Sequence, residues 1–328
     1  MSERLMANST VEAVNLTKRY GTRTAVDDVS FTTRPGDIVG LLGPNGAGKT
    51  TTIRLLTTVL TPTSGQFWIA GHPWTSPDEI RRRVGVLPES GGYPGFQTGQ
   101  EYLHYHALLY GFTGAKATGI ADSLLAEVGL DDRAGSRISG YSRGMRQRLG
   151  IARALVNNPA VVFFDEPNLG LDPAGQSQVL EIIRRVAHGR GATVILSTHM
   201  LSEVEEVCSR VIILNEGSLV ASGTVGDVMR TAEVERAAQL RVPTNLIERA
   251  RRALSEVPDL VIERTDGRPD VVRISLRTSA GVAADETSER LNAAIVAVAA
   301  ANVPVLSYEM EGARLTDAFL QMTRRAAS

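Results

Sequence analysis

Cysteines and long apolar segments are scarce in this sequence of 328 residues. The single cysteine, Cys208, excludes an intramolecular disulfide and any CxxC metal or redox pair, and it fits a reducing compartment. The longest purely apolar run, Ala293–Ala301, has nine residues, whereas a bilayer span needs about 20. The N-terminal segment MSERLMANST also lacks a long apolar stretch. We therefore expect a chain that is neither exported nor membrane-spanning.

Lysine is also rare: the chain has three lysines, Lys18, Lys49 and Lys116, and 32 arginines. The 35 basic and 36 acidic side chains nearly cancel, so no field of the whole chain favours nucleic acid or an anionic membrane surface. We expect no nucleic-acid partner. With 43% hydrophobic and 22% charged residues, the composition is that of a globular protein and excludes disordered and collagen-like chains.

From Val11 to about Ser222, short β-rich runs alternate with helical stretches, which predicts an α/β fold with a mainly parallel sheet covered by helices. Several strands are apolar almost throughout, as strands buried on both faces should be. The expected strands include Ile38–Leu42, Ala160–Phe164, Thr193–Ser197 and Val211–Leu214, and the expected helices include Thr50–Leu60, Gln100–Leu109, Met145–Val156 and Gly175–His188.

A second unit begins near Thr231, and we place the two domains at residues 9–226 and 231–328. The later domain follows the order βαββαβ, which suggests a small α+β domain of the ferredoxin-like, split βαβ type. Its expected elements are Gln239–Val242, Leu246–Ser255, Leu260–Arg264, Val271–Leu276, Glu286–Ala301 and Val305–Tyr308. A final helix, Leu315–Arg325, could pack on either unit.

The segment GPNGAGKT, Gly43–Thr50, matches the P-loop pattern between an apolar strand and a helix. Its glycines let successive backbone N–H groups point at phosphate oxygens, and the positive end of the helix dipole reinforces them. Lys49 would reach the β- and γ-phosphates, and the Thr50 hydroxyl would bind Mg²⁺. An ordinary turn between a strand and a helix is the alternative. The expected ATP-binding residues here are Gly43, Pro44, Asn45, Gly46, Ala47, Gly48, Lys49, Thr50 and Thr51.

A nucleoside triphosphatase of this kind also needs a carboxylate near the metal, and the segment VVFFDEP supplies two. Asp165 lies at the carboxyl end of an apolar strand, where open α/β sheets bind ligands, and we expect it to hold Mg²⁺. Glu166 follows directly and is placed to polarise an attacking water. Adjacent strand residues face opposite ways, but at the end of a strand both can reach one site.

Taken in order, these and further motifs resemble the nucleotide-binding subunit of an ATP-binding cassette (ABC) transporter, over about Val11–Ser222. The resemblance implies a P-loop NTPase fold with a helical subdomain at about residues 90–157, which binds and hydrolyses ATP with Mg²⁺. The further motifs are Tyr20, an adenine-stacking aromatic; YSRGM at Tyr141–Met145, the signature; GLD at Gly170–Asp172; and His199 in STH, the switch histidine.

Resemblance to this family also implies a head-to-tail dimer with two ATP molecules between the subunits. Ser142 and Gly144 of one subunit would cap the γ-phosphate bound at Lys49 of the other, and Asp172 would also contribute to nucleotide binding. Whether the second subunit is identical or different is left open by the sequence. The expected catalytic residues are Glu166, His199 and Lys49.

Two departures from the common family pattern concern the site. Glu89, in VGVLPES, stands where a glutamine is usual, at a position expected to bind Mg²⁺ and the attacking water. A carboxylate can bind Mg²⁺ more strongly than an amide, so activity can survive the exchange. In the signature, Arg143 and Met145 replace glycine and glutamine.

These departures, together with PNLGLDP and the C-terminal extension, resemble the branch that serves drug, antibiotic, lipid or polysaccharide exporters, with daunorubicin-resistance-type ATPases nearest. That branch implies a separate transmembrane permease as partner and a peripheral place on the cytoplasmic face of the membrane. The transported molecule cannot be read from this chain, because the permease would line its path. The later domain could stabilise the dimer, regulate it or dock a partner.

Aromatic residues concentrate in Gly92–Phe112, the helical region that receives the membrane subunit in this family. We expect Tyr93 and Phe96 to be exposed and to bind that partner, since aromatics are enriched at interfaces. The alternative is that these rings fill the core of the subdomain.

Two other functions compete with the exporter. One is a soluble ABC ATPase that acts on ribosomes or DNA, against which stand the single cassette and the absence of sustained heptads between Thr50 and Tyr141. The other is a regulatory module in which the later domain senses a ligand and ATP is only structural.

Overall fold

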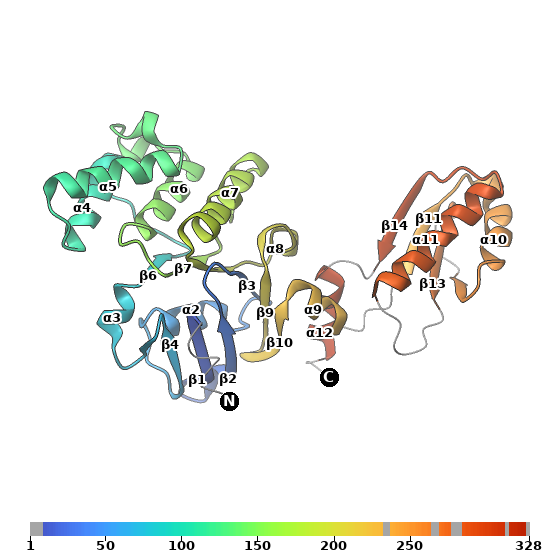
Figure 1. Ribbon diagram of the computed structural model, residues 1–328, viewed down its shortest axis with the longest axis horizontal. Coiled ribbons are helices and arrows are strands. Elements are labelled where there is room, and N and C mark those ends of the chain that lie inside the picture. Colours follow the sequence, from blue (N-terminus) through green and yellow to red (C-terminus); the bar gives the residue numbers. More distant parts are fainter. Residues whose placement is uncertain (1–8, 232–236, 264–268, 277–283, 312–314, 326–328) are drawn as a thin grey trace. The chain divides into compact units, whose positions relative to one another are not determined.

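The computed structural model describes residues 9–231, 237–263, 269–276, 284–311 and 315–325. The chain divides after Val225 into two compact units, which are treated separately below. Figure 1 shows the elements of each unit.

One sheet with the strand order β5-β4-β1-β2-β10-β9-β3-β8-β7-β6 runs through the first unit. The neighbours from β9 to β6 pair in parallel, whereas β1 pairs antiparallel with β2 and β4. The expected parallel α/β core is therefore confirmed, and an antiparallel part is joined to it. The strands are β1 (Val11–Tyr20), β2 (Arg23–Thr33), β3 (Ile38–Leu42), β4 (Ser64–Ile69), β5 (His72–Pro73), β6 (Val84–Leu87), β7 (Val161–Asp165), β8 (Thr193–Ser197), β9 (Arg210–Asn215) and β10 (Ser218–Thr224).

Helices cover the sheet, and α4, α5 and α6 gather into a separate group in Figure 1. Helix α4 begins with a capping box in which the side chains of Thr98 and Glu101 each accept from the other's backbone N–H. The helices are α2 (Lys49–Leu56), α3 (Pro77–Arg81), α4 (Gly99–Leu109), α5 (Gly114–Glu127), α6 (Arg143–Ala154), α7 (Pro173–Arg190) and α8 (Leu201–Val207). Helix α9 (Val225–Thr231) spans the division between the two units.

Alternate residues of the central strands enter two different cores, one on each face of the sheet. On β7, Val162 and Phe164 belong to the core that includes the helical group, whereas Val161 and Phe163 belong to the core around α2. Successive side chains of a strand point to opposite faces, so a strand that is apolar throughout is buried on both. All five residues of β3, β7 and β8 are buried.

The helix that follows the P-loop is shorter than the expected Thr50–Leu60. It ends at Leu56, because the Thr57 hydroxyl donates to the Ile53 carbonyl, 2.8 Å away, and Thr58 has a left-handed φ of 60°. Threonine hydroxyls that bond back to the preceding turn compete with helix continuation, and a left-handed residue ends it.

The second unit has the expected βαββαβ order, and its antiparallel sheet has the strand order β12-β13-β11-β14. This order is compatible with a ferredoxin-like domain. One face of the sheet forms an apolar core with α10 and α11, whose members include Leu240, Ile274 and Leu291. The elements are β11 (Ala237–Arg241), α10 (Ile247–Ser255), β12 (Leu260–Glu263), β13 (Val271–Leu276), α11 (Ala284–Ala300), β14 (Ser307–Glu311) and α12 (Leu315–Arg325).

Candidate functional site

The loop between β3 and α2 has two positions that only glycine can fill. Gly43 has φ of 155°, and a Cβ there would lie 2.4 Å from the Leu214 carbonyl oxygen. Gly48 has φ of 102°, and its Cβ would lie 2.5 Å from the Ala25 carbonyl oxygen. Both glycines therefore let the loop approach neighbouring strands closely, in backbone conformations that side chains disfavour.

Lys49 lies at the first position of α2 and is only 8% exposed. Its Nζ donates to the carbonyl oxygens of Gly43 at 2.7 Å and Pro44 at 3.3 Å. Burial lowers the pKa of Lys49, and the nearby carboxylates of Glu166 and Asp165 oppose that shift. The loop thus holds a buried ammonium group with acidic residues opposite it.

Asp165 ends β7 and is 6% exposed. The hydroxyl of Ser197, its partner across the ladder to β8, donates to Asp165 Oδ1. This bond orients the carboxylate and leaves its second oxygen available to a cation.

Glu166 follows in a left-handed conformation with φ of 50°. Its backbone N–H donates to the carbonyl of Ser197 at 3.1 Å and to the hydroxyl of the same residue at 3.2 Å. Left-handed backbone is uncommon for a residue with a side chain, and such strain gathers at functional sites. Here it turns the chain at the end of β7, so that both Asp165 and Glu166 face one cavity.

The Glu166 carboxylate is paired with the switch histidine, because Oε2 lies 2.9 Å from His199 Nδ1. The Glu166 side chain is 15% exposed and that of His199 is 54% exposed. His199 follows β8, so the pair joins two neighbouring strand ends.

These groups line a single cavity of about 330 Å³. The carboxyl ends of β3, β6, β7 and β8 lie at one edge of the sheet, where open α/β sheets bind ligands. The lining consists of Arg23, Ala25, Asn45, Gly46, Ala47, Gly48, Lys49, Thr50, Thr51, Glu89, Asp165, Glu166, Leu169 and His199.

Oxygen ligands for a magnesium ion are present in this cavity. Thr50 offers a hydroxyl, and Asp165 and Glu89 offer carboxylates. Among the described residues no group of three or more His, Cys, Asp and Glu side chains could hold a metal ion. Mg²⁺ is typically held by one or two carboxylates together with substrate phosphates, so this donor set fits the ion.

Six expected nucleotide-binding residues lie outside the cavity lining, and two of them, Gly43 and Pro44, are the P-loop residues whose carbonyls accept from Lys49. The other four lie farther along the chain or before the loop. Tyr20 is 46% exposed, and Lys18 Nζ lies 5.3 Å from the centre of its ring. The Ser142 hydroxyl caps α6 by accepting from Met145 N–H at 3.2 Å, and the Asp172 carboxylate caps α7 through Gly175 N–H at 3.1 Å. Gly144 lies in the first turn of α6.

Sequence reasoning missed several residues that build the site. Arg23 and Ala25 line the cavity although they belong to no recognised motif, and Leu169 lines it from within PNLGLDP, where no role was assigned to it. Glu203 is buried on α8, where its carboxylate accepts from the Thr198 hydroxyl at 3.1 Å, and burial raises its pKa. The segment STHMLSE places this acid one helical turn beyond His199, which could have identified it as a neighbour of the site.

The expectation for the two aromatic residues is half wrong. Phe96 is 77% exposed, as expected. Tyr93 packs against the helical core and meets the Tyr102 ring at a centroid distance of 5.8 Å, and burial raises its pKa to about 12. Tyr93 is therefore half-buried against the core, with its hydroxyl end close to the face of Gly150, where a side chain would leave it no room.

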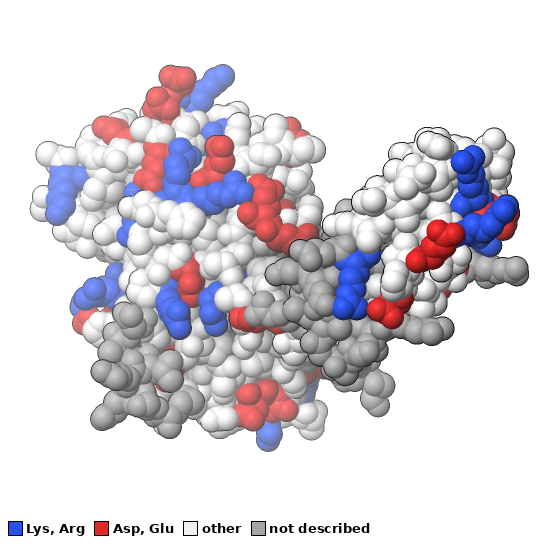
Figure 2. Space-filling model, turned by 45° about the vertical axis from the view of Figure 1, so that its right-hand side comes forward, with Lys and Arg blue, Asp and Glu red and all other residues white. Residues whose placement is uncertain are grey.

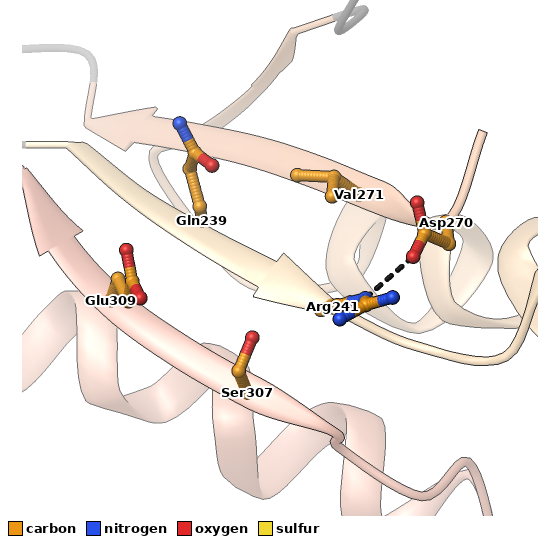
Figure 3. Close-up of a pocket in the computed structure, with 6 residues that line it drawn as sticks. All are labelled: Gln239, Arg241, Asp270, Val271, Ser307 and Glu309. Atoms are coloured by element: carbon orange, nitrogen blue, oxygen red, sulfur yellow. Dashed lines mark hydrogen bonds and ion pairs between the residues drawn. The ribbon is translucent and has the colours of Figure 1, made fainter. Parts of the chain in front are cut away.

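A second hollow, of about 410 Å³, lies on the face of the second unit's sheet opposite its apolar core. Figure 3 shows side chains from β11 and β14 on this face, with Arg241 paired to Asp270 at 2.6 Å. The hollow contains no glycine-rich loop and none of the recognised motifs. It is lined by Gln239, Arg241, Asp270, Val271, Ser307 and Glu309.

Comparison with known proteins agrees with the geometry of the cavity. Residues 26–168 match the ABC transporter family. The chain is 38% identical over 219 residues to the Nod factor export ATP-binding protein I of Paraburkholderia xenovorans, a match that covers 66% of this chain and 72% of that protein. The chain belongs to the ABC transporter family.

Two further relatives place this ABC ATPase among similar proteins. It is 39% identical to the daunorubicin/doxorubicin resistance ATP-binding protein of Streptomyces peucetius, over 66% of each chain. It is 30% identical to the linearmycin resistance ATP-binding protein of Bacillus subtilis, a match that covers 94% of this chain and all of that one. The second match extends into the C-terminal unit of the ABC protein.

Solved structures share the fold of the ABC ATPase. An ATP-binding subunit of an ABC transporter superposes with a TM-score of 0.62 at 33% identity, covering 68% of this chain and 93% of that one. A dimeric ATP-binding cassette bound to ADP and Pi superposes with a TM-score of 0.60 at 24% identity, covering 65% and 98%. The described part of the chain contains no helix long and apolar enough for a membrane span.

Proposed function

We propose that this ABC ATPase is the ATP-binding and ATP-hydrolysing subunit of an exporter and drives a separate transmembrane permease. One observation carries the hydrolytic part: a single cavity gathers Lys49, Asp165, Glu166 and His199 beside the P-loop. The transport part is supported by relatives named for Nod factor export and for daunorubicin and linearmycin resistance. The exported cargo would be a drug, antibiotic, lipid or polysaccharide, and the two resistance proteins support a drug or antibiotic.

ATP phosphates would bind in the loop between β3 and α2. Backbone N–H groups of Gly43–Thr51 and the start of α2 favour anions, and the Lys49 ammonium, which gives two N–H donors to carbonyls, would give its third to a phosphate oxygen. Thr50, Asp165 and Glu89 would hold Mg²⁺. When bound, Mg²⁺ neutralises charge on the phosphate oxygens. Tyr20, exposed at the end of β1, would stack on the adenine.

Glu166 would act as the general base. Its carboxylate lies in the cavity and can accept a proton from the attacking water. His199, held against Glu166 Oε2, would fix the direction of that carboxylate and contact the γ-phosphate from its exposed side. Glu89 is exposed after β6 and could reach the same water.

Completion of the site would need a second subunit arranged head to tail. Ser142 and Gly144 begin α6 outside the cavity lining, so in one subunit they do not reach the bound phosphates. In a homodimer they would cap the γ-phosphate at Lys49 of the other subunit, and Asp172 would add to the same closed interface. Residues 9–226 would form this ATP-binding domain, with residues 231–328 as an accessory domain.

The permease would dock on the helical group, at about residues 90–157, and hold the ATPase at the cytoplasmic face of the membrane. Phe96 is the most exposed large apolar side chain among the described residues, and Tyr105 and Leu109 on α4 are half-exposed or more. Tyr105 and Leu109 are four residues apart and share one face of α4, and exposed apolar side chains mark interaction sites. Phe96→Ala should therefore reduce co-purification with a transmembrane subunit, and unchanged co-purification would remove Phe96 from the docking surface.

No described feature favours the ribosome- or DNA-acting alternative. On the face shown in Figure 2, basic and acidic side chains are interspersed, whereas a nucleic-acid surface gathers basic ones.

The substitution Glu166→Gln tests the proposed hydrolytic mechanism. An amide cannot accept the proton, so we expect turnover to fall by about 100-fold or more while ATP binding and ATP-driven dimerisation remain. Turnover is measured by phosphate release and dimerisation by size-exclusion chromatography. The matched control is Glu181→Gln, an exposed residue of α7 outside the cavity. Wild-type turnover in Glu166→Gln would remove Glu166 from the catalytic role.

A further inference from the structure

Arg143 is the first residue of α6 and stands in the signature where glycine is usual. A cation at the N-terminus of a helix opposes the helix dipole, and the first turn of α6 contains no acidic residue. Arg143 makes no hydrogen bond or ion pair with the described residues. Helix stability therefore does not explain why arginine occupies this position.

The Arg143 guanidinium instead lies across the face of Gly170. A Cβ built on Gly170 would lie 2.5 Å from Arg143 Cζ, 2.6 Å from Nη1 and 2.8 Å from Nη2. Nearly equal distances to three atoms of a planar group mean that the group lies flat over this point. Gly170 has a left-handed φ of 69°, which exposes its Cα to the stacked guanidinium.

A hydrogen bond and a close approach also join α6 to the same loop. Gln147, one turn after Arg143, donates from Nε2 to the Pro167 carbonyl at 2.6 Å. The Leu171 side chain lies 3.9 Å from the place of a Cβ on Gly144. The first two turns of α6 thus meet the loop Pro167–Leu171 through Arg143 and Gln147, with Leu171 close to Gly144, and that loop begins directly after Glu166.

We propose that Arg143 is a positioning residue that ties the signature turn to the loop after the catalytic Glu166 within one subunit. This inference rests on the head-to-tail dimer of the proposed function. In that dimer the signature turn of each subunit meets the nucleotide of the other. Arg143 then links the nucleotide held by the partner to the placement of Glu166 in its own subunit, so that the two sites hydrolyse ATP together.

The substitution Arg143→Ala tests the link, with Arg146→Ala as the matched control. Both arginines are exposed on α6, but Arg146 donates to the Ser139 carbonyl, away from the loop. We expect Arg143→Ala to lower kcat by on the order of tenfold, because small misplacements of a reacting group are costly. It should also flatten the dependence of rate on ATP concentration while the affinity of the monomer for nucleotide is unchanged. Arg143→Lys should not restore kcat, because an ammonium cannot lie flat on Gly170.

A double-mutant cycle with Gly170→Ala tests the contact itself. The left-handed φ penalises alanine equally in both backgrounds, but the clash with the guanidinium exists only when Arg143 is present. Because the exposed guanidinium can swing away from the added Cβ, Gly170→Ala should break the contact at little extra cost in stability, and it should therefore lower kcat more in the wild type than in Arg143→Ala. Additive effects would overturn the proposal.

A raised KM for ATP with unchanged kcat in Arg143→Ala would also overturn it, because it would place the guanidinium on the partner's nucleotide. Wild-type kinetics of Arg143→Ala would overturn it as well. If the proposed head-to-tail dimer does not form, Glu166→Gln will remain monomeric in the presence of ATP. That result would count against the proposed function and is distinguishable from the outcomes above.

Discussion

Replacement of Lys49 by methionine separates the cost of burying an ammonium from its use in binding phosphate. Methionine has similar length and no charge. Without nucleotide, the variant loses the hydrogen bond to the Gly43 carbonyl. It also no longer buries a charged ammonium group, and the lowered pKa of Lys49 shows that this burial is unfavourable. These changes oppose each other, so we expect the stability of the nucleotide-free protein to change by no more than about 1 kcal/mol.

With nucleotide the balance differs. An ammonium has three N–H donors, and the carbonyls of Gly43 and Pro44 take two, so one remains for a phosphate oxygen in the cavity. A hydrogen bond between charged groups contributes up to ~3 kcal/mol, so its loss weakens binding about 150-fold. At a ligand concentration of 100 times the wild-type Kd, stabilisation falls from ~2.7 to ~0.3 kcal/mol.

The assay is thermal unfolding with and without a non-hydrolysable ATP analogue and Mg²⁺. At ~2–4 °C per kcal/mol for a domain of this size, the wild type should shift by ~5–10 °C and Lys49→Met by about 1 °C. Lys49→Arg is the charge-conserving comparison and should lose hydrolysis, because the guanidinium is larger than the enclosed ammonium. A full thermal shift in Lys49→Met, or normal hydrolysis by Lys49→Arg, would refute the role given to this lysine.

Two remaining predictions concern stability. Burial, and then the Arg153 charge, lower the pKa of His106 from 6.5 to about 4, so the folded state binds fewer protons than the unfolded state between these values. The contribution of His106 to the free energy of unfolding is complete above pH 6.5 and should be lost as the pH drops towards 4, at a cost of about 2 kcal/mol after a discount for the partly exposed ring. Urea unfolding should show a smaller loss of stability over this pH range in His106→Gln than in the wild type. An equal loss in both would contradict the prediction. Gly48→Ala should lower the free energy of unfolding by about 2 kcal/mol or more, because the new Cβ would meet the Ala25 carbonyl. Gly46→Ala is the control: its Cβ would lie in open space, so it should cost about 1 kcal/mol. Equal melting temperatures of the two variants would contradict the close approach at Gly48.

The parts of the site that lie in one short segment could be predicted from the sequence. The P-loop, Asp165 and Glu166 are contiguous motifs at the ends of apolar strands, and the structure places them in one cavity. Pattern also predicted the parallel core and the βαββαβ order of the second unit.

Contacts between distant segments could not be read in this way. Ala25 lines the cavity because its strand, β2, lies directly against Gly48 of the P-loop. The Arg143 guanidinium, on α6, contacts Gly170, in the loop that follows Glu166. Tyr93 was misjudged because the sequence shows an aromatic residue but not the direction in which its ring packs. The left-handed turn at Glu166 likewise has no local signal, since it is imposed by the two hydrogen bonds to Ser197.

That left-handed turn has an evolutionary consequence. A side chain in this conformation costs about 1 kcal/mol relative to glycine, so the glutamate is kept against the preference of the backbone. In a lineage that no longer needs hydrolysis at this site, replacement of Glu166 by glycine or asparagine would increase stability and could spread by drift. A glutamate at this position is therefore a sign of continued selection for turnover, and its identity in related chains can separate active sites from sites that only bind nucleotide.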